Sequence, residues 1–340
     1  MSQDWTQRVG AVAIGRNEGE RLRRCLASLQ QETSRVVYVD SGSDDGSPQM
    51  ARERGAVVVD LDMSIPFTAA RARNAGFERL RERWPDVEYV QFVDGDMEVL
   101  PGWLATAVGV LDDNPDVVAV IGWRRERHPE RSIYNRVCDV EWRMGGVGET
   151  ENFGGDVMFR ASALAEVGGY DTRVIAAEDD ELGVRLREHG GVMLRIDHES
   201  TLHDADMHRF AQWWTRAKRC GHAYAQVSAM HGAGPHRKFV RELRRVWVFG
   251  AMLPGGAVAL TLPTLGLSWL GLGLYPVNAA RIARDTHRRG FAWPDAVAWG
   301  ISCALSPIPQ ALGAAKFLLD RARDKRPEII EYKGPAKRRP

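Results

Sequence analysis

This chain of 340 residues has almost no net charge and no closely spaced pair of cysteines. Its 46 basic and 45 acidic residues leave a formal net charge of +1, which gives no argument for a nucleic-acid partner. Its four cysteines are scattered without CxxC spacing, as is typical of isolated thiols in a reducing compartment. The first ten residues hold no apolar core, so we expect no signal peptide.

Internal repeats, low-complexity tracts and the common phosphate-binding loops are absent too. No GxGxxG fingerprint for a dinucleotide is present, and no GxxxxGK[ST] loop. What remains is a chain long enough for one large domain with an accessory region, or for two domains.

One stretch, residues 89–98, combines a buried strand with two carboxylates. The strand half is β-branched and aromatic, and it leads into Asp94-Gly95-Asp96. Gly95 lets the backbone turn, so that the two carboxylates converge. Convergent oxygen ligands suit Mg²⁺ or Mn²⁺, above all when substrate phosphates complete the shell. The alternative is an ordinary polar turn, which also favours this sequence.

Short apolar runs alternate with helical patterns along the first 200 residues. Strands are predicted at 8–14, 35–39, 56–59, 89–93, 117–121, 157–160 and 193–196, and helices near 22–29, from residue 47 onward, and near 68–83, 102–111, 161–167 and 178–186. The second of these helices is expected to have Ser47 as its N-cap. The alternation predicts an α/β fold with a mostly parallel sheet covered by helices on both faces.

Polar clusters follow three of the predicted strands. They are Arg16-Asn17-Glu18, Asp40 and Asp94-Gly95-Asp96. Ligands of such sheets bind beyond the carboxyl ends of the strands, so we expect these acids and the arginine around one crevice.

Three further segments each allow two interpretations. The acids of Glu178-Asp179-Asp180-Glu181 either favour a helix start or include a general base. His203, just past a strand end, is either structural or a metal or phosphate ligand. The arginine-rich segment 124–149 is expected to be a solvated loop rather than a lid over an acceptor.

The last third of the chain is apolar. Residues 246–280 and 296–315 carry no charge and are flanked by arginines, but prolines and glycines interrupt both runs. They are interpreted either as broken helices at a membrane interface, the favoured reading, or as a helical cap. We therefore predict a domain at 1–230, an apolar helical region at 231–325 and a charged, flexible tail at 326–340.

As an ordered set, these motifs resemble those of the family 2 inverting glycosyltransferases, over about residues 8–225. In the order of the family they are Ala13-Ile14-Gly15-Arg16-Asn17-Glu18, Val39-Asp40-Ser41-Gly42-Ser43-Asp44-Asp45-Gly46-Ser47, Ala72-Arg73-Asn74-Ala75-Gly76, Asp94-Gly95-Asp96, Gly168-Gly169-Tyr170-Asp171 and Glu178-Asp179-Asp180-Glu181-Leu182. The resemblance implies the nucleotide-diphosphosugar (GT-A) fold. It also implies a metal-dependent transfer of a sugar, with a UDP-sugar as the expected donor, to a hydroxyl acceptor.

The resemblance also implies residue roles. Asp40 would bind uracil, Glu18 the ribose or base, and Asp94 the ribose or sugar. Asp96 would bind the divalent metal, His203 would be a further metal or phosphate ligand, and Asp179 would be the base. The remaining residues expected at the nucleotide or diphosphate are Ile14, Arg16, Asn17, Ser43, Arg73, Asn74, Gly95, Glu178, Arg216 and Arg219.

One departure from the family concerns polymer synthesis. Processive members carry Gln-x-x-Arg-Trp, whereas this chain has Gln212-Trp213-Trp214-Thr215-Arg216. We therefore expect a single-transfer enzyme of cell-surface polysaccharide or glycolipid synthesis at the cytoplasmic face of the membrane, with an acceptor that could be lipid-linked. Two alternatives stay open: a sugar-phosphate nucleotidyltransferase on a related sheet, and a non-catalytic protein that binds nucleotide sugars at the membrane.

Overall fold

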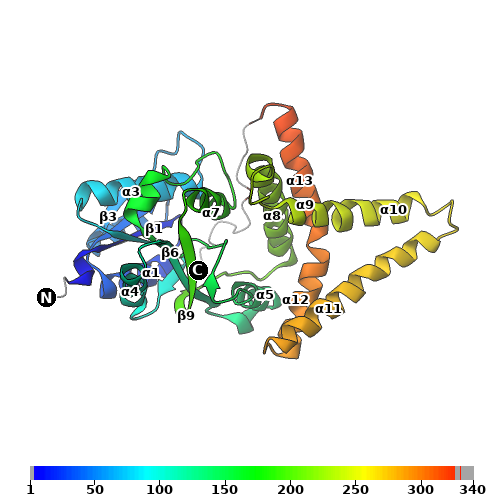
Figure 1. The fold of residues 1–340 in the computed structure, drawn as a ribbon, viewed down its shortest axis with the longest axis horizontal. Coiled ribbons are helices and arrows are strands. Elements are labelled where there is room, and N and C mark those ends of the chain that lie inside the picture. Colours follow the sequence, from blue (N-terminus) through cyan, green and yellow to red (C-terminus); the bar gives the residue numbers. More distant parts are fainter. Residues whose placement is uncertain (1–3, 326–329, 331–340) are drawn as a thin grey trace. The chain divides into compact units, whose positions relative to one another are not determined.

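A mixed β-sheet is the centre of the first of two compact units in the computed structural model, which describes residues 4–325 and 330 (Figure 1). The unit comprises residues 4–127 and 145–205 of the described chain. Its strands are β1 Val9–Gly15, β2 Val36–Asp40, β3 Val57–Asp60, β4 Tyr89–Asp94, β5 Met97–Val99, β6 Val117–Glu126, β7 Gly148–Glu149, β8 Met158–Arg160 and β9 Val192–His203.

The order of the strands places the early strands together. It is β3-β2-β1-β4-β8-β6-β9-β5, with β7 paired to β9. Strands β1 to β4 are mutually parallel where they pair, as is the pair of β6 and β9. The short strand β8 lies between β4 and β6 and is antiparallel to both. The carboxyl ends of β1, β2 and β4 therefore lie at one edge of the sheet.

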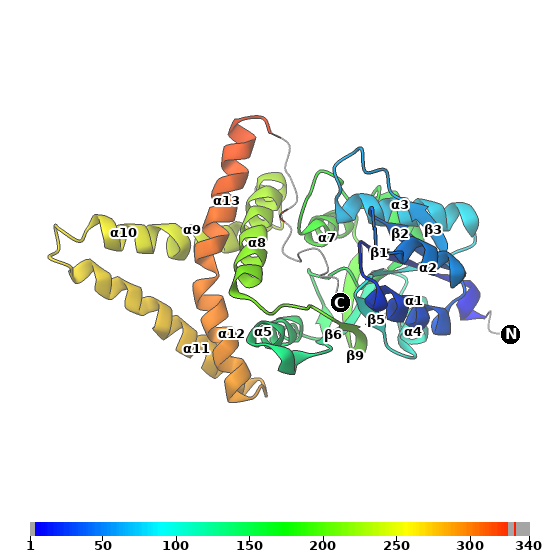
Figure 2. The same cartoon turned by 180° about the vertical axis from the view of Figure 1, so that it is seen from behind.

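Helices cover both faces of this sheet, as Figure 2 shows from behind. On one face, α1 Glu20–Glu32 and α4 Trp103–Asp113 pack on Val9, Ala11 and Ala13 of β1. On the other, α3 Ala69–Arg83, α6 Ala161–Glu166 and α7 Glu178–Glu188 pack against the intervening positions of the same strands. The alternation of side chains along a strand produces these two cores. The predicted fold class is confirmed.

The second unit, residues 128–144 and 206–325 with residue 330, is helical over most of its length. Its elements are α5 Ile133–Trp142, α8 Phe210–His231, α9 Val240–Trp247, the π-helix η3 Val248–Met252, α10 Leu253–Ala259, the 3₁₀-helix η4 Leu267–Gly273, α11 Leu274–Arg288, α12 Trp293–Leu305 and α13 Pro307–Ala322.

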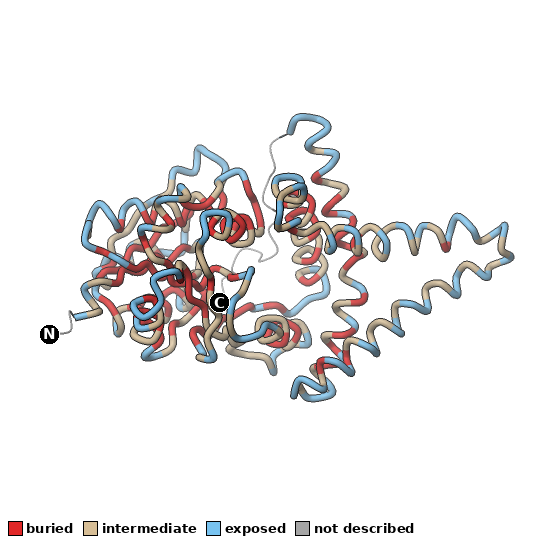
Figure 3. Tube along the Cα trace, viewed as in Figure 1, coloured by how far each residue is buried: buried red, intermediate tan, exposed pale blue. Residues whose placement is uncertain are grey.

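Helices α8 and α13 approach each other through glycines. A Cβ added at Gly221 would lie 1.9 Å from the carbonyl oxygen of Gln310, and one at Gly313 would lie 1.9 Å from that of Lys218. The two backbones are thus in direct contact, and buried residues of this unit run along the pair, whereas α10 and α11 are largely exposed (Figure 3).

Several local predictions need correction. Residues 124–149 are not one solvated loop, because they contain the end of β6, helix α5 and β7. The N-cap of α2 Ser47–Glu53 is Gly46, in a left-handed conformation with φ of 84°, and Ser47 is the first helical residue.

Other predictions about the chain's organisation are not decided. Over residues 4–325 and 330, no helix combines the length and the apolar character needed to cross a bilayer. The predicted boundary at residue 230 stays a prediction, and so does the tail, which apart from residue 330 lies outside the described residues.

Candidate active site

Three strand ends meet where the sequence places its polar clusters. In the register of the sheet, Gly15 pairs with Asp40 and Ile14 pairs with Asp94. The amide of Gly95 donates a 2.7 Å hydrogen bond to the carbonyl oxygen of Ile14. A Cβ on Gly95 would lie 3.2 Å from that oxygen, so the close approach of the two loops favours glycine.

Asp40 organises the loop that follows β2. Its Oδ2 accepts hydrogen bonds from the amides of Gly42 and Ser43, at 2.9 and 2.8 Å. Its Oδ1 accepts from the hydroxyls of Tyr38 and Ser43, at 2.8 and 2.5 Å. A carboxylate offers about four lone-pair directions. Four donors of the protein already occupy them, so the predicted contact of Asp40 with a base would have to compete with these bonds.

The loops after β1 and β2 are tied together. Ser43 Oγ accepts from the amide of Asn17 at 2.9 Å, and Asn17 Oδ1 accepts from the amide of Asp44 at 2.9 Å. Asn17 adopts a left-handed conformation with φ of 56°, which asparagine tolerates well. In the same loop Arg16 is exposed, and Glu18 forms an ion pair with Arg21 at 2.8 Å.

Arg73 of α3 brings three predicted site acids together. Its Nη1 donates to Glu178 Oε1 at 2.6 Å and lies 3.4 Å from Asp179 Oδ1, while its Nη2 donates to Asp94 Oδ1 at 3.0 Å. The guanidinium also lies over the ring of Tyr170, 5.3 Å from its centroid. Arg73 is 3% exposed, so its charge is neutralised by these carboxylates rather than by water. The sequence predicted Arg73 at the nucleotide; in the structure it holds the acids.

The surroundings of Asp179 favour the protonated form of its carboxyl group. Burial, and secondarily the negative charges of Glu178 and Asp94, raise the pKa of its carboxyl well above the usual range, against the opposing effect of Arg73. A raised pKa brings a carboxylate closer to the value that suits general-base catalysis. Asp94 is the most accessible acid of the cluster, with 35% of its side chain exposed.

Asn74 serves the fold of the turn before α7. Its Nδ2 donates to the carbonyl oxygen of Tyr170 at 2.8 Å, and its Oδ1 accepts from the amide of Tyr170 at 2.9 Å. This two-point contact orients the Tyr170 ring under Arg73. Asn74 was predicted close to the nucleotide, a role that these contacts do not require.

Two further residues at the cluster, Gly155 and Asp156, were not predicted from the sequence. The side chain of Asp156 is bonded by Arg124 of β6 and by Thr201 of β9. Gly155, next in the chain, lies against Arg73 and Asp94, and a Cβ there would be 2.5 Å from Arg73 Nη2 and 2.9 Å from both Asp94 carboxylate oxygens. The motif Gly154-Gly155-Asp156 was a signal, but its partners depend on the placement of β8.

Gly155→Ala should disturb this cluster. The added methyl group cannot fit unless Arg73 or Asp94 moves, so we expect a loss of about 1–3 kcal/mol in stability and weaker nucleotide binding. Urea unfolding and nucleotide titration measure the two effects. Gly146→Ala is the matched control because a Cβ at Gly146 meets nothing within 4 Å. Equal behaviour of the two variants would contradict the close packing of Gly155.

Asp96, directly before β5, and His203 of β9 form a separate pair, because Met97 of β5 is in register with His203. Oδ1 of Asp96 lies 3.5 Å from Nε2 of His203, and Nδ1 of His203 lies 3.9 Å from Glu126 Oε2. Both side chains of the pair are buried. Glu126 was not predicted at the site, and the carboxyl side of β6 gave no pattern that would have singled it out.

This pair fits part of a divalent-metal site. Across the described residues, no group of three or more His, Cys, Asp or Glu side chains is arranged to hold a metal. Two donors at about 2.1 Å on neighbouring corners of an octahedron lie roughly 3 Å apart, close to the spacing of this pair. Mg²⁺ and Mn²⁺ sites commonly draw their other ligands from water and substrate phosphates, so two protein donors are compatible with the predicted cofactor.

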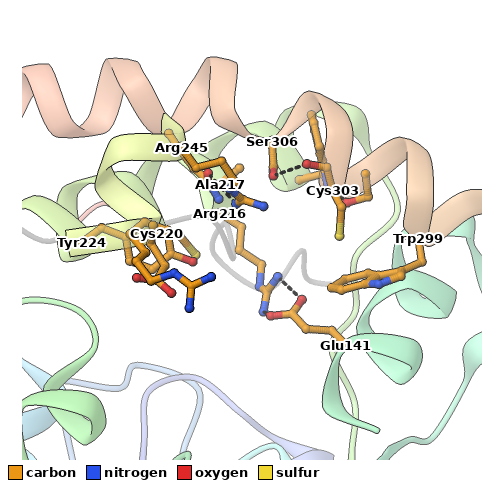
Figure 4. Close-up of a pocket in the computed structure, with 14 residues that line it drawn as sticks. Glu141, Arg216, Ala217, Cys220, Tyr224, Arg245, Trp299, Cys303 and Ser306 are labelled. Atoms are coloured by element: carbon orange, nitrogen blue, oxygen red, sulfur yellow. Dashed lines mark hydrogen bonds and ion pairs between the residues drawn. The ribbon is translucent and has the colours of Figure 1, made fainter. Parts of the chain in front are cut away.

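Arg216 and Arg219 lie on α8 in the second unit. The guanidinium of Arg216 makes a two-point ion pair with Glu141 of α5, at 2.7 and 2.9 Å. Arg216 and Glu141 line a cavity of about 640 Å³ (Figure 4). Its other walls include Cys220, Arg245 and Trp299. Because Glu141 already balances the charge of Arg216, the predicted role of this arginine at a diphosphate needs a rearrangement of that pair. The roles of both arginines stay predictions.

Comparison with known proteins gives the same family as the motifs. Residues 12–168 match the family described as "Glycosyl transferase family 2". A TPR repeat-containing protein of Synechococcus elongatus is 31% identical over 38% of this chain and 30% of its own length. The N-acetylglucosaminyl-diphospho-decaprenol L-rhamnosyltransferase of Mycobacterium tuberculosis is 29% identical over 56% of this chain and 74% of its own length. The match thus spans less than a third of the first relative and about three quarters of the second.

Among solved structures, a mannosyltransferase from Pyrobaculum calidifontis, in complex with GDP-Man and Mn²⁺, superposes with a TM-score of 0.61. The alignment covers 92% of this chain and 88% of that one at 19% identity, a level of similarity that speaks for the fold. The mixed sheet, the strand-end acids and the family match agree: the region of residues 12–168 belongs to glycosyl transferase family 2, the glycosyltransferases (EC 2.4), and the chain has the GT-A fold.

Proposed function

We propose that this chain transfers a sugar from a nucleoside-diphosphate donor to a hydroxyl group of an acceptor, with inversion at the sugar carbon. The observation that carries the proposal is the cluster in which Arg73 joins Asp94, Glu178 and Asp179 at the carboxyl ends of the strands. It sets the accessible carboxylate of Asp94 beside the partly buried carboxylate of Asp179, whose pKa is raised, and such a pairing suits sugar binding and proton transfer.

In the proposed reaction the Asp179 carboxylate takes the proton of the acceptor hydroxyl as its oxygen attacks the anomeric carbon. The bond from that carbon to the phosphate oxygen breaks, and the nucleoside diphosphate leaves with the electron pair. The positive charge of Arg73 opposes the raised pKa of Asp179 and so favours the ionised form that acts as the base. Asp94 would accept hydrogen bonds from hydroxyls of the donor.

A divalent ion would be held by Asp96 and His203, and it would supply positive charge to the departing diphosphate. That arrangement is supported by the spacing of the two donors and by the Mn²⁺ present with the sugar nucleotide in the similar mannosyltransferase.

We also propose that the acceptor is lipid-linked, and that the reaction belongs to glycolipid or polysaccharide synthesis at the cytoplasmic face of the membrane. The mycobacterial relative is named for a diphospho-decaprenol acceptor. The apolar, uncharged run of residues 246–280 supports a position next to lipid.

Release of nucleoside diphosphate tests the proposal. The full chain is incubated with UDP- and GDP-sugars and Mn²⁺, with polyprenyl phosphates as acceptors. Asp96→Ala should remove most of the metal-dependent release and the stabilisation by nucleotide with Mn²⁺, which is about 2.7 kcal/mol at 100 times the dissociation constant. Asp113→Ala, at an exposed carboxylate of α4, is the control.

The outcomes separate the alternatives. Pyrophosphate instead of nucleoside diphosphate would identify a nucleotidyltransferase. Binding of nucleotide without turnover on any acceptor would identify a non-catalytic protein. Full activity of Asp96→Ala with Mn²⁺ would contradict the metal-binding role.

A further inference from the structure

Two arms of the second unit, residues 246–280, present apolar side chains without a partner among the described residues. They are the π-helix η3 with α10, and η4 with α11, joined by residues 260–266 (Figure 1). Leu262 and Leu265 at the connection are 87% and 95% exposed. The other exposed large apolar residues are Val248, Met252, Val258, Leu260, Leu267, Trp269, Leu270, Leu274 and Val277. A contiguous patch of this kind marks a surface that is covered in use.

The polar side chains of this hairpin bond inward. Thr261 and Thr264 donate to the carbonyl oxygens of Ala257 and Leu260, at 2.9 and 2.6 Å. Ser268 Oγ also donates to Ala257, at 2.7 Å, and Trp269 Nε1 donates to Thr261 Oγ1 at 2.9 Å. Water-facing side chains do not need such partners, whereas side chains in hydrocarbon do. The polar side chains of the hairpin therefore have the internal hydrogen bonds that a lipid environment requires.

The two arms are also tied to each other. The hydroxyl of Tyr275 in α11 donates to the carbonyl oxygen of Phe249 in η3. Every polar side chain between residues 251 and 277 thus has a hydrogen-bond partner within the hairpin. These hydrogen bonds hold the two arms together within the hairpin.

On both arms the first arginine lies at the same distance along the chain from the connection. The first charged residues on either side are Arg245 and Arg281, each 17 residues from the connection at 262–264. From the connection to Arg281, the 3₁₀-helix at about 2.0 Å and the α-helix at about 1.5 Å per residue give roughly 25 Å. Half of a bilayer with its headgroups measures about 20–22 Å. Tip leucines at the midplane would thus place Arg281 among the headgroups, whereas the side chain of Arg245 lines the cavity of the second unit and donates to Gln310.

The charge at that depth is positive. Seven arginines flank the hairpin, Arg241, Arg244, Arg245, Arg281, Arg284, Arg288 and Arg289, against the two acids Glu242 and Asp285. Arg281, Arg284 and Arg288 line one shallow pocket on α11. A guanidinium binds phosphate oxygens through two parallel hydrogen bonds, so this surface is complementary to phospholipid headgroups.

We propose that the hairpin of residues 246–280 inserts into one leaflet of a phospholipid bilayer, with Leu262 and Leu265 deepest and the flanking arginines on anionic headgroups. The proposal names the element that carries the membrane association put forward under the proposed function. Its test measures binding alone, so the result does not depend on whether the chain transfers a sugar.

Flotation of the full chain with vesicles tests the insertion. Wild type should float with phosphatidylcholine vesicles that contain one quarter phosphatidylglycerol. Leu262→Asp combined with Leu265→Asp should lower the bound fraction about tenfold or more, because acids at the deepest positions oppose insertion. The matched control is Leu318→Asp with Leu319→Asp, at half-exposed positions of α13 outside the hairpin, and it should float as wild type does.

The arginines are tested on vesicles of two compositions. Arg281→Gln with Arg284→Gln should weaken binding to vesicles with phosphatidylglycerol several-fold, and less so at high salt, but should change binding to pure phosphatidylcholine little. Thermal melting confirms that each variant is folded. Equal flotation of wild type and the tip variant would overturn the proposal. So would a lipid-free dimer of the wild type that the tip variant abolishes, since the hairpin would then be an interface between copies.

Discussion

Asp179→Asn should lower kcat by about 10²- to 10⁴-fold, the range in which a positioned general base contributes. The amide keeps the size of the side chain but cannot accept the proton of the acceptor hydroxyl. Because Asp94 is left in place, nucleotide affinity should change little. The variant should melt no lower than wild type, since it removes a partly buried carboxylate that Glu178 and Asp94 repel. Single-turnover kinetics and nucleotide titration measure the two quantities.

The pH profile gives an independent reading of the same residue. Burial holds the pKa of Asp179 well above the ordinary carboxyl range, and the ionised form is the base. The acidic limb of kcat/KM should therefore lie at higher pH than an exposed aspartate would give, and activity should fall as the pH drops through it. In Asp179→Asn this limb should vanish from the residual activity. An unchanged rate, with Asp180→Asn behaving the same, would remove Asp179 from the mechanism.

Arg73→Met should be the most destabilising single change at the site. It leaves the carboxylates of Asp94, Glu178 and Asp179 without the cation that joins them. Of these three acids, Glu178 is the most buried. Breaking a buried ion pair from one side costs about 3–5 kcal/mol. That loss corresponds to a melting temperature lower by roughly 6–20 °C in a domain of this size.

The loss should depend on pH in a defined direction. Without Arg73 the pKa of Asp179, which is already raised, rises further above its value in the unfolded chain. The additional penalty in the variant therefore appears as the pH rises above the pKa of Asp179 in the folded wild type, and it shrinks as protonation neutralises the acids at lower pH. Melting at pH 7 and pH 5 should show a smaller difference from wild type at pH 5. Arg79→Met, at a half-exposed arginine of the same helix paired with Glu82, is the control and should change little at either pH.

The sequence was sufficient for the architecture because buried strands and helix faces repeat with fixed periods. The runs at 36–39 and 89–93 are apolar enough to identify central strands, and Gly95 marks the turn between the two carboxylates. It was less informative about β8, since three residues that pair antiparallel with both neighbours leave little periodic signal. The contacts of Gly155 and Asp156 depend on that strand.

The direction in which each side chain points was the other property that the sequence could not predict. Arg73 and Asn74 are neighbours in one motif, yet one bonds three acids and the other bonds the backbone of Tyr170. Successive residues of a helix point about 100° apart, so a shared motif does not imply a shared partner. Asp40 is similar, because its four bonds to its own loop follow from the conformation of that loop rather than from the strand before it.

The position of β8 also bears on how the chain emerges during translation. One edge of β4 is completed only by residues 158–160, although β4 itself ends at residue 94. At about 5–20 residues per second, the ribosome takes roughly 3–13 s to supply the missing partner. During that interval an apolar strand with open backbone donors and acceptors is available to other nascent chains. Slower elongation past residue 94 should thus increase the demand for chaperones.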